Sequence, residues 1–326
     1  MTKIDLITGI LGSGKTTFLK HYARYLISQG KRIAILENDF GAVNVDMMIL
    51  QDLKCENSQL EMVSGGGDPH CHRRRFKTQL IALGMQHFDR VIVEPSGIFD
   101  MDEFFDTIHE PPLDRWFEIG SILTVIDAET DDVLPEQMEY LFASEAACCG
   151  KLILSKRSSF PDETDEHISE RILSHLERSL GEIRCDRHFT GNDLLIKEWD
   201  SFTESDYRSL LTAGYRGSSY VKKHHAGDII GGVHYFMHIA IPEEKIVPTV
   251  EKIIRSDGYG RIMRIKGSLP DVCGGWIKLN ATREKTELSP VSEGQAVLIV
   301  IGDDISREGI DEVFRAVNTD PEYISI

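Results

Sequence analysis

The sequence is short of cysteine and of long apolar runs, and each shortage excludes a class of protein. Six cysteines in 326 residues, two of them adjacent and expected to be buried (Cys148, Cys149), do not suit a disulfide-stapled secreted domain. No stretch approaches the roughly 18 consecutive apolar residues that indicate a membrane-spanning helix. The apolar run at the amino terminus is short and broken by Asp5 and by glycines, which argues against a signal peptide. We therefore expect a soluble, cytoplasmic protein with no membrane partner.

Basic residues are also scarce. The chain has 36 lysines and arginines against 53 aspartates and glutamates, for a net charge of −17. Nucleic acids and anionic membranes need a basic footprint, so we expect neither as a partner. The excess of acid is uneven, with 23 basic and 37 acidic residues in 1–220 against 13 and 16 in 221–326. This contrast, together with Gly and Ser residues clustered just before position 220, predicts two domains, 1–220 and 221–326.

The pattern of apolar residues predicts an α/β fold for the first domain. Strands are expected at 4–9, 32–38, 90–95, 121–127 and 151–156, with an amphipathic helix from Thr16 to Ser28. Strands that alternate with helices indicate a mainly parallel sheet covered by helices on both faces. The second domain reads as a smaller α+β module. Its expected strands are 233–241, 261–268, 275–281 and 296–302, and its expected helices are 243–256 and 306–317.

A loop typical of phosphate binding lies between the first predicted strand and the first predicted helix. Residues 9–16 read GILGSGKT, which matches G-x-x-x-x-G-K-[ST] in the right structural context. The glycines let backbone N–H groups turn toward phosphate oxygens, and the helix N-terminus adds its dipole. Lys15 would reach the β- and γ-phosphates, and the Thr16 hydroxyl would ligate Mg²⁺. The predicted nucleotide-binding residues of this loop are Gly9, Gly12, Ser13, Gly14, Lys15, Thr16 and Thr17.

Carboxylates follow three of the predicted strands. Glu94 is followed three residues later by Gly97, which suits an acid that orders Mg²⁺ and water and a backbone N–H that senses the γ-phosphate. Asp39, after another strand, lies in a segment that could order around the γ-phosphate and Mg²⁺ and collapse on hydrolysis. We predict that Lys15, Asp39 and Glu94 are catalytic. Solvated turns are the alternative at both acids, and Asp127, after a third strand, fits a surface turn equally well.

With these motifs assembled, the sequence resembles the CobW family of P-loop GTPases, relatives of HypB and UreG. The family's G-x-x-G-x-G-K-T-T loop matches residues 9–17, its N-E-F-G-x-x-x-x-D switch matches 38–46, and its E-x-S/T-G motif matches 94–97. A V-x-D-A segment matches 125–128, and the second domain resembles the family's carboxy-terminal domain at 261–269 and 296–302. The resemblance implies a nucleotide-switched metal chaperone or insertase, or an accessory factor of cobalamin metabolism.

The region that carries a G-C-x-C-C metal motif in family members departs from it here. Residues 64–73 read SGGGDPHCHR, so imidazoles stand where thiols are usual. Mixed nitrogen and sulfur ligands suit Zn²⁺ or Co²⁺. In an extended segment His70 and His72 would share a face with Cys71 opposite, so all three would bind one ion only from a turned loop. The resemblance adds Glu37 as a fourth ligand, and a mobile loop with solvated histidines is the alternative.

A second departure concerns the nucleotide base. GTPases usually select guanine with N-K-x-D, whose Asp accepts two hydrogen bonds from the base, whereas residues 155–158 here read SKRS. Lys156 can still lie across the base, but Ser158 offers no carboxylate. Guanine preference should therefore weaken unless another acid substitutes. GTP is the first expectation through the family, and ATP is a competitor.

Four further histidines favour plain interpretations. His224 and His225 lie before the second domain and fit a solvated pair. His234 and His238 are four apart in a predicted strand, so we expect them to share a face, where packing or exposure is favoured over metal binding. Their part in metal binding stays open.

Together these features predict a switch that couples GTP binding and hydrolysis to delivery of a transition metal into a metalloenzyme or corrinoid-related client. Hydrolysis should be slow because these motifs encode no arginine finger. Two alternatives use the same loop: a P-loop small-molecule kinase, and a non-catalytic adaptor gated by nucleotide. The metal, the client and the oligomeric state are left open.

Overall fold

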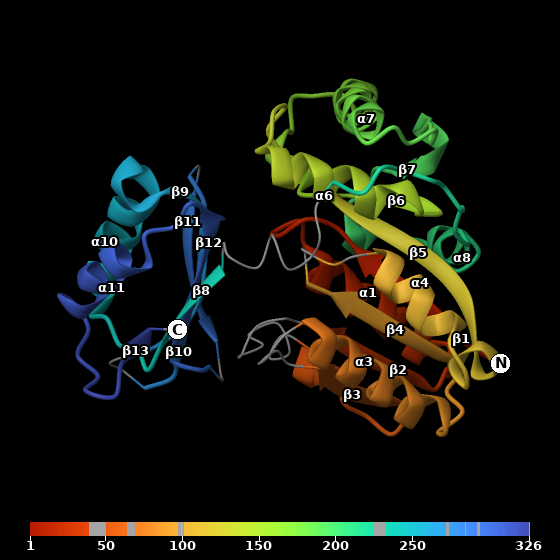
Figure 1. Ribbon diagram of the computed structural model, residues 1–326, viewed down its shortest axis with the longest axis horizontal. Helices are drawn as coiled ribbons and strands as arrows, with labels where there is room; N and C mark the ends of the chain where they lie inside the picture. Colours follow the sequence, from red (N-terminus) through yellow and green to blue (C-terminus); the bar gives the residue numbers. More distant parts are fainter. Residues whose placement is uncertain are drawn as a thin grey trace. The chain divides into compact units, whose positions relative to one another are not determined.

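The computed structural model describes residues 1–38, 50–63, 69–96, 99, 101–223, 233–271, 274–283, 285–291 and 294–325. The described residues form two compact units, one that extends to residue 223 and one that begins at residue 233 (Figure 1). The predicted boundary near residue 220 stays a prediction. Of the helices described, none combines the length and the apolar character that crossing a membrane requires.

The first unit is built on a seven-stranded sheet in the order β3-β2-β4-β1-β5-β6-β7, and every neighbouring pair is parallel. The strands are β1 (Thr2–Thr8), β2 (Ile33–Asn38), β3 (Ser58–Val63), β4 (Arg90–Pro95), β5 (Phe117–Asp127), β6 (Lys151–Ser155) and β7 (Leu194–Leu195). The prediction of a mainly parallel α/β sheet is confirmed. The prediction lacks two edge strands, β3 and β7. The sequence of β3, SQLEMV, has no continuous apolar run, and β7 is only two residues long, which is too short for a strand pattern.

Helices lie on both sides of this sheet in Figure 1. They are α1 (Lys15–Ser28), α3 (Pro69–Gly84), α4 (Met101–His109), α5 (Leu113–Trp116), α6 (Glu136–Ala147), α7 (Asp165–Glu182) and α8 (Glu204–Leu211). Short 3₁₀ turns lie at η1 (Gln51–Leu53), η2 (Arg157–Ser159), η3 (Gly191–Asp193) and η4 (Trp199–Ser201). In one core cluster, Phe18, Leu19 and Tyr22 of α1 pack with apolar residues of β1, β2, β4, β5 and β6. The apolar face of α1 is buried against the sheet, and the helix starts beside the carboxyl end of β1.

The second unit is a six-stranded antiparallel sheet in the order β11-β10-β9-β12-β8-β13. Its strands are β8 (Val233–Met237), β9 (Arg261–Pro270), β10 (Trp276–Ala281), β11 (Thr286–Val291), β12 (Val297–Asp303) and β13 (Ile324–Ser325). Its helices are α10 (Glu243–Arg255) and α11 (Arg307–Arg315), with a 3₁₀ turn at η6 (Asp257–Tyr259). Apolar residues of both helices and of the sheet form one core, in which the Phe236 and Phe314 rings lie 4.8 Å apart. The predicted α+β module is confirmed, with β11 and β13 added.

The direction of the parallel strands positions the predicted motifs. Parallel strands bring their carboxyl ends to the same edge of a sheet, which is where α/β proteins bind ligands. The loop after β1, the ends of β2 and β4, and the turns after β5 and β6 therefore meet at one edge. The register agrees: Glu37 pairs with Glu94, and Asp127 pairs with Ser155. This edge holds the candidate site.

Candidate functional site

The loop after β1 adopts a backbone that its glycines make accessible. Gly9 has φ 138° and Gly14 has φ 95°, a region that other residues rarely enter. A Cβ on Gly9 would lie 2.3 Å from the Val125 carbonyl oxygen and 2.6 Å from Ser13 Oγ. Gly14 is also the N-cap of α1, so the helix begins directly at Lys15. The loop therefore ends on a helix N-terminus, where unpaired N–H groups and the helix dipole favour a phosphate.

Lys15 lies folded over this loop. Its side chain is buried, and Nζ donates hydrogen bonds to the carbonyl oxygens of Gly9 (2.7 Å) and Ile10 (3.4 Å). Ser13 Oγ is buried and has no hydrogen-bond partner among the described residues. A buried cation and an unsatisfied hydroxyl inside a glycine loop fit an anionic ligand, because both gain partners when phosphate oxygens arrive.

Thr16 is bonded to the carboxylate that ends β4. The Thr16 hydroxyl donates to Glu94 Oε1 at 2.7 Å, and both side chains are buried. Glu37, in register with Glu94 on the neighbouring strand, is buried as well. A hydroxyl and carboxylates are the hard oxygen ligands that Mg²⁺ uses beside nucleotide phosphates, so these residues fit that ion. The predicted Asp39 and Gly97 lie outside the described residues.

The predicted transition-metal ligands lie partly in a helix. α3 begins at Pro69, so Cys71 and His72 belong to its first turns, and the prediction of an extended or looped segment is wrong for them. Proline suits the first helical position because its missing N–H would have no partner there. At 3.6 residues per turn, positions two apart do not share one face of a helix, so the common face expected for an extended segment does not apply in α3.

The described ligand candidates do not assemble into a metal centre. Burial lowers the pKa of His72 to about 4, with Arg75 adding to the effect, so its imidazole is neutral. Cys71 Sγ lies 3.9 Å from Arg74 Nη2. Across the residues that the structure describes, no three His, Cys, Asp or Glu side chains are placed to hold one ion, and this includes Glu37, Cys71 and His72. The His70 side chain and residues 64–68 are outside the described part.

The predicted base-binding residue, Lys156, lies just past β6 in a cluster of acids. Its backbone has φ 54°, which is uncommon for lysine, and its Nζ donates to Asp127 Oδ2 at 2.5 Å and to Glu129 Oε2 at 2.9 Å. Burial raises the pKa of Asp127 although Lys156 opposes the rise, while the two acids outweigh desolvation and raise the pKa of Lys156. Ser158 is exposed in η2, and Ser159 Oγ donates to Glu129 at 2.6 Å. Asp127 therefore helps to hold the Lys156 side chain at this edge of the sheet.

Two residues at this edge were not found from the sequence. Glu145 of α6 accepts a hydrogen bond from the Gly9 N–H at 2.7 Å. Trp199 of η4 donates from Nε1 to the Leu154 carbonyl at 3.0 Å, and its ring would be 3.1 Å from a Cβ on Gly14. Neither lies in a motif, and both are distant from the loop in the chain, so no local signal could have found them.

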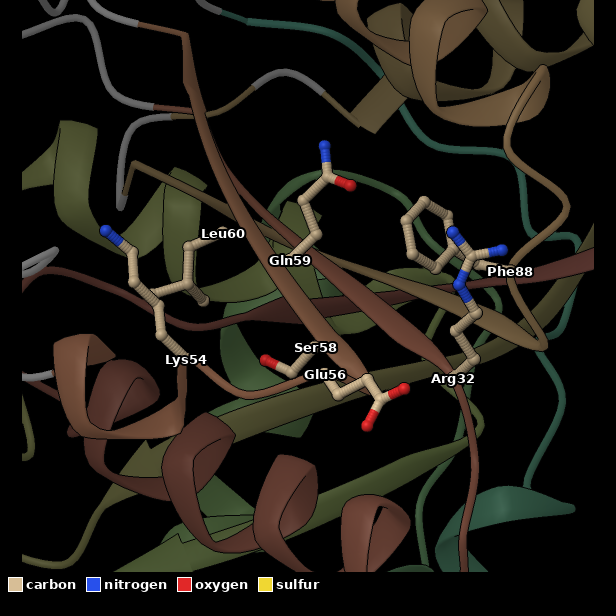
Figure 2. Close-up of a pocket in the computed structure, with 7 residues that line it drawn as sticks. All are labelled: Arg32, Lys54, Glu56, Ser58, Gln59, Leu60 and Phe88. Carbon is tan, nitrogen blue, oxygen red and sulfur yellow. The ribbon is translucent and has the colours of Figure 1, made fainter.

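A surface pocket of about 360 Å³ lies elsewhere on the first unit. Figure 2 shows the residues that line it, which are Arg32, Lys54, Glu56, Ser58, Gln59, Leu60 and Phe88. Arg32 precedes β2, Ser58 begins β3 and Phe88 precedes β4, so the pocket is at the amino ends of these strands, opposite the phosphate-binding loop. The Arg32 guanidinium lies 4.6 Å from the centre of the Phe88 ring. The pocket contains none of the predicted site residues.

The remaining predictions have mixed outcomes. Cys148 and Cys149 follow α6 and are buried, as predicted. His234 is in β8, but His238 follows the end of the strand with φ 51°, so the prediction that the two share a strand face is wrong. His224 and His225 lie outside the described residues.

Known proteins resemble this chain, and the family model that matches it falls within its first unit. A family model described as "CobW/HypB/UreG, nucleotide-binding domain" matches residues 3–180. The chain is 30% identical over 128 residues to the zinc chaperone YeiR of Escherichia coli, covering 39% of this chain and 38% of YeiR. It is 28% identical over 163 residues to the zinc chaperone YjiA of E. coli, covering 47% and 48%. The crystal structure of Zn(II)-bound YjiA GTPase from E. coli covers 98% of this chain and 99% of that one, at 17% identity and a TM-score of 0.35. The matches thus span about half or less of the two curated relatives.

Proposed function

This chain belongs to the CobW/HypB/UreG family, and from that membership and the geometry of the sheet edge we propose that it is a GTPase switch for metal delivery. It would bind GTP with Mg²⁺, hydrolyse it slowly, and use the change of nucleotide state to release a transition metal to a client metalloprotein. The names of YeiR and YjiA, both zinc chaperones, make Zn²⁺ the first metal to test, with Co²⁺ second.

The observation that carries the proposal is the hydrogen bond between Thr16 and Glu94. It joins the hydroxyl of the phosphate-binding loop to the carboxylate at the end of β4, 78 residues away in the chain. In a P-loop nucleotide switch these two groups would hold Mg²⁺ together, so they need to lie close to each other, and the ion would neutralise phosphate charge. A glycine-rich turn with an incidental Lys-Thr would have no need of this buried pair.

Each residue then has a part in binding or hydrolysis. Backbone N–H groups within residues 10–16 hold the phosphates, and Lys15 moves from the Gly9 carbonyl to the β- and γ-phosphates. Thr16 and Glu94 would hold Mg²⁺, which when bound neutralises charge on the phosphate oxygens. Family resemblance assigns Asp39 to the ordering of metal and water, and Gly97 to sensing the γ-phosphate. Without an arginine finger from a partner, hydrolysis stays slow.

The base would be recognised beside Lys156. The ammonium group is held by Asp127 and Glu129, which fixes the side chain beside the turn that carries Ser158. With Ser158 in place of an acid, one bidentate contact to guanine is missing, so GTP is preferred over ATP by less than in GTPases with N-K-x-D.

The transition metal is the cargo. Glu37, His70, Cys71 and His72 are the proposed ligands, and neutral imidazole and thiolate suit Zn²⁺. His72 is neutral because of its burial. The ligands lie on segments next to the nucleotide edge, so their assembly would depend on nucleotide, which is how GTP and the metal would be coupled.

The test is a titration of GTP and ATP against the wild-type protein and Cys71→Ala, with and without Zn²⁺ or Co²⁺, with affinity and hydrolysis recorded. Cys55→Ala is the matched control, because Cys55 is exposed and precedes β3 at the opposite edge of the sheet. We expect tighter binding of GTP than of ATP, and a metal response that Cys71→Ala reduces and Cys55→Ala leaves intact. Equal binding of the two nucleotides with no metal effect would overturn the proposal.

A further inference from the structure

Glu145 lies directly beneath the phosphate-binding loop, at the carboxyl end of α6. Its side chain is 1% exposed, and Oε2 accepts the Gly9 N–H at 2.7 Å. Its own backbone carbonyl accepts hydrogen bonds from Thr124 Oγ1 at 3.1 Å and from Thr8 Oγ1 at 3.4 Å. The backbone at Glu145 is therefore anchored to β1 and β5, and its carboxylate is bonded to the loop through the Gly9 N–H.

The peptide groups of Gly9 are held from two sides. Glu145 accepts from the Gly9 N–H, and Lys15 Nζ donates to the Gly9 carbonyl at 2.7 Å. The Val125 carbonyl oxygen would lie 2.3 Å from a Cβ on Gly9, so β5 packs closely against this side of the residue. Glu145 thus sets where the phosphate-binding loop begins, and a change at Glu145 reaches the phosphates through Gly9.

The same carboxyl places a second acid charge where a polyanion must bind. Oε1 is buried and has no hydrogen-bond partner among the described residues. Burial raises the pKa of Glu145 to about 7, although Lys15 and the Gly9 N–H act to lower it. Lys15, from α1, is the charged group that acts on this carboxyl, and β1 and β5 meet Glu145 with Thr8 and Thr124, which do not titrate in this range. When the Lys15 ammonium group turns to the phosphates, the Glu145 carboxylate loses part of the positive charge that offsets its own negative charge.

We propose that Glu145 is a positioning residue that couples nucleotide affinity to its own ionisation. The neutral carboxyl still accepts the Gly9 N–H through its carbonyl oxygen, but it no longer opposes the phosphate charge. A proton is therefore taken up on Glu145 as the nucleotide binds, and affinity falls as pH rises and this uptake becomes harder. The inference rests on the proposed function to the extent that a nucleotide must occupy the loop.

The test compares GTP affinity at pH 6 and pH 8 in wild type, Glu145→Gln and Glu136→Gln, by calorimetry with Mg²⁺. Glutamine keeps an acceptor for Gly9 without the charge, and Glu136 is an exposed acid of the same helix. Titration of GTP itself affects all three proteins equally. Wild type and Glu136→Gln should lose about fivefold more affinity between pH 6 and pH 8 than Glu145→Gln, as expected when a bound ligand raises the Glu145 pKa from about 7 by about one unit. Identical pH profiles for wild type and Glu145→Gln would overturn the inference, whereas a lack of GTP binding by the wild type would overturn the proposed function.

A second measurement needs no variant. Calorimetric titration of wild type with GDP at pH 7.5, in two buffers with different heats of ionisation, reports protons exchanged on binding. At this pH the terminal phosphate of GDP, with a second pKa of about 6, is almost fully ionised and adds little to the exchange. Net uptake of a substantial fraction of one proton supports the assignment, and no uptake contradicts it.

Glu145→Ala, which lacks the acceptor, should bind GTP more weakly than Glu145→Gln at both pH values. Equal binding by these two variants would contradict the positioning role.

Discussion

The two ends of the candidate nucleotide site are built differently. At the phosphate end, glycines, Lys15 and Thr16 lie next to one another in the chain, and the groups that matter are buried. At the base end, Lys156 is held by two acids from another turn, with the ammonium group partly exposed. One end is a backbone cradle formed by a contiguous motif, and the other is a set of side chains that only the fold brings together.

This difference shows which part of the chemistry tolerates change. A phosphate is bound by backbone N–H groups, which do not depend on the side chain. The glycines that shape the loop and one lysine are therefore sufficient for phosphate binding. A base is distinguished by paired polar contacts from particular side chains, and replacing one acid alters the choice of base without disturbing the phosphates. Substitutions should therefore have large effects on rate and stability at the phosphate end and smaller effects, on selectivity, at the base end.

The largest effect should come from Lys15→Ala. The proposed role of Lys15 is to stabilise charge on the phosphates, so its removal should lower kcat for GTP hydrolysis by about 100-fold or more. Single-turnover phosphate release measures this, with Lys20→Ala, further along α1, as the control because Lys20 pairs with Asp52 on the surface. A hydrolysis rate within tenfold of wild type would contradict the expectation that substitutions at the phosphate end have the largest effects.

The second effect is on stability and depends on pH. The folded-state pKa of Glu145, about 7, is above its ordinary value of 4.5, so the stabilisation is fully present below 4.5 and is lost as pH rises through 7. Between pH 5 and pH 8 the wild type should lose up to about 3 kcal/mol of unfolding free energy relative to Glu145→Gln. Urea unfolding at both pH values measures the difference. Parallel changes in the two proteins would show that the carboxyl is ionised throughout.

A third substitution tests the proposed Mg²⁺ ligand at the phosphate end. Thr16→Val keeps the side-chain shape but removes the hydroxyl that is bonded to Glu94 in this structure and that would ligate Mg²⁺ beside the nucleotide. Mg²⁺-dependent GTP affinity should therefore fall about tenfold or more. Binding in EDTA should be equal in the two proteins, which serves as the control. An equal loss with and without Mg²⁺ would assign Thr16 to the phosphates alone.

The smallest effect should appear at the base end. Ser158→Asp restores the missing acid of the N-K-x-D pattern, so the ratio of GTP to ATP affinity should rise by about tenfold. Competition binding with the two nucleotides measures the ratio, and kcat for bound GTP should stay near wild type. A change in kcat with no change in the ratio would mean that the two ends are not separable in this way.

Local sequence was enough for the elements with strong apolar patterns and insufficient for the edges. The apolar run Ile33, Ala34, Ile35 and Leu36 predicts β2, and the structure buries all four residues in the sheet. β3, with the sequence SQLEMV, is half exposed at the sheet edge and has no such run. At α3 the glycines and histidines favoured a loop, and the start at Pro69 shows that a helix proceeds from there.

The sequence by itself determined the phosphate end, because a P-loop is written in eight consecutive residues whose backbone conformation is local. It also determined the alternation of strands and helices from which the parallel sheet followed. Only the tertiary structure brought Glu94 to Thr16, Asp127 and Glu129 to Lys156, and Glu145 to Gly9. Each of these contacts joins residues from different strands, turns or helices. Such contacts depend on the order of the strands and on how the helices pack, and no single stretch of sequence specifies either.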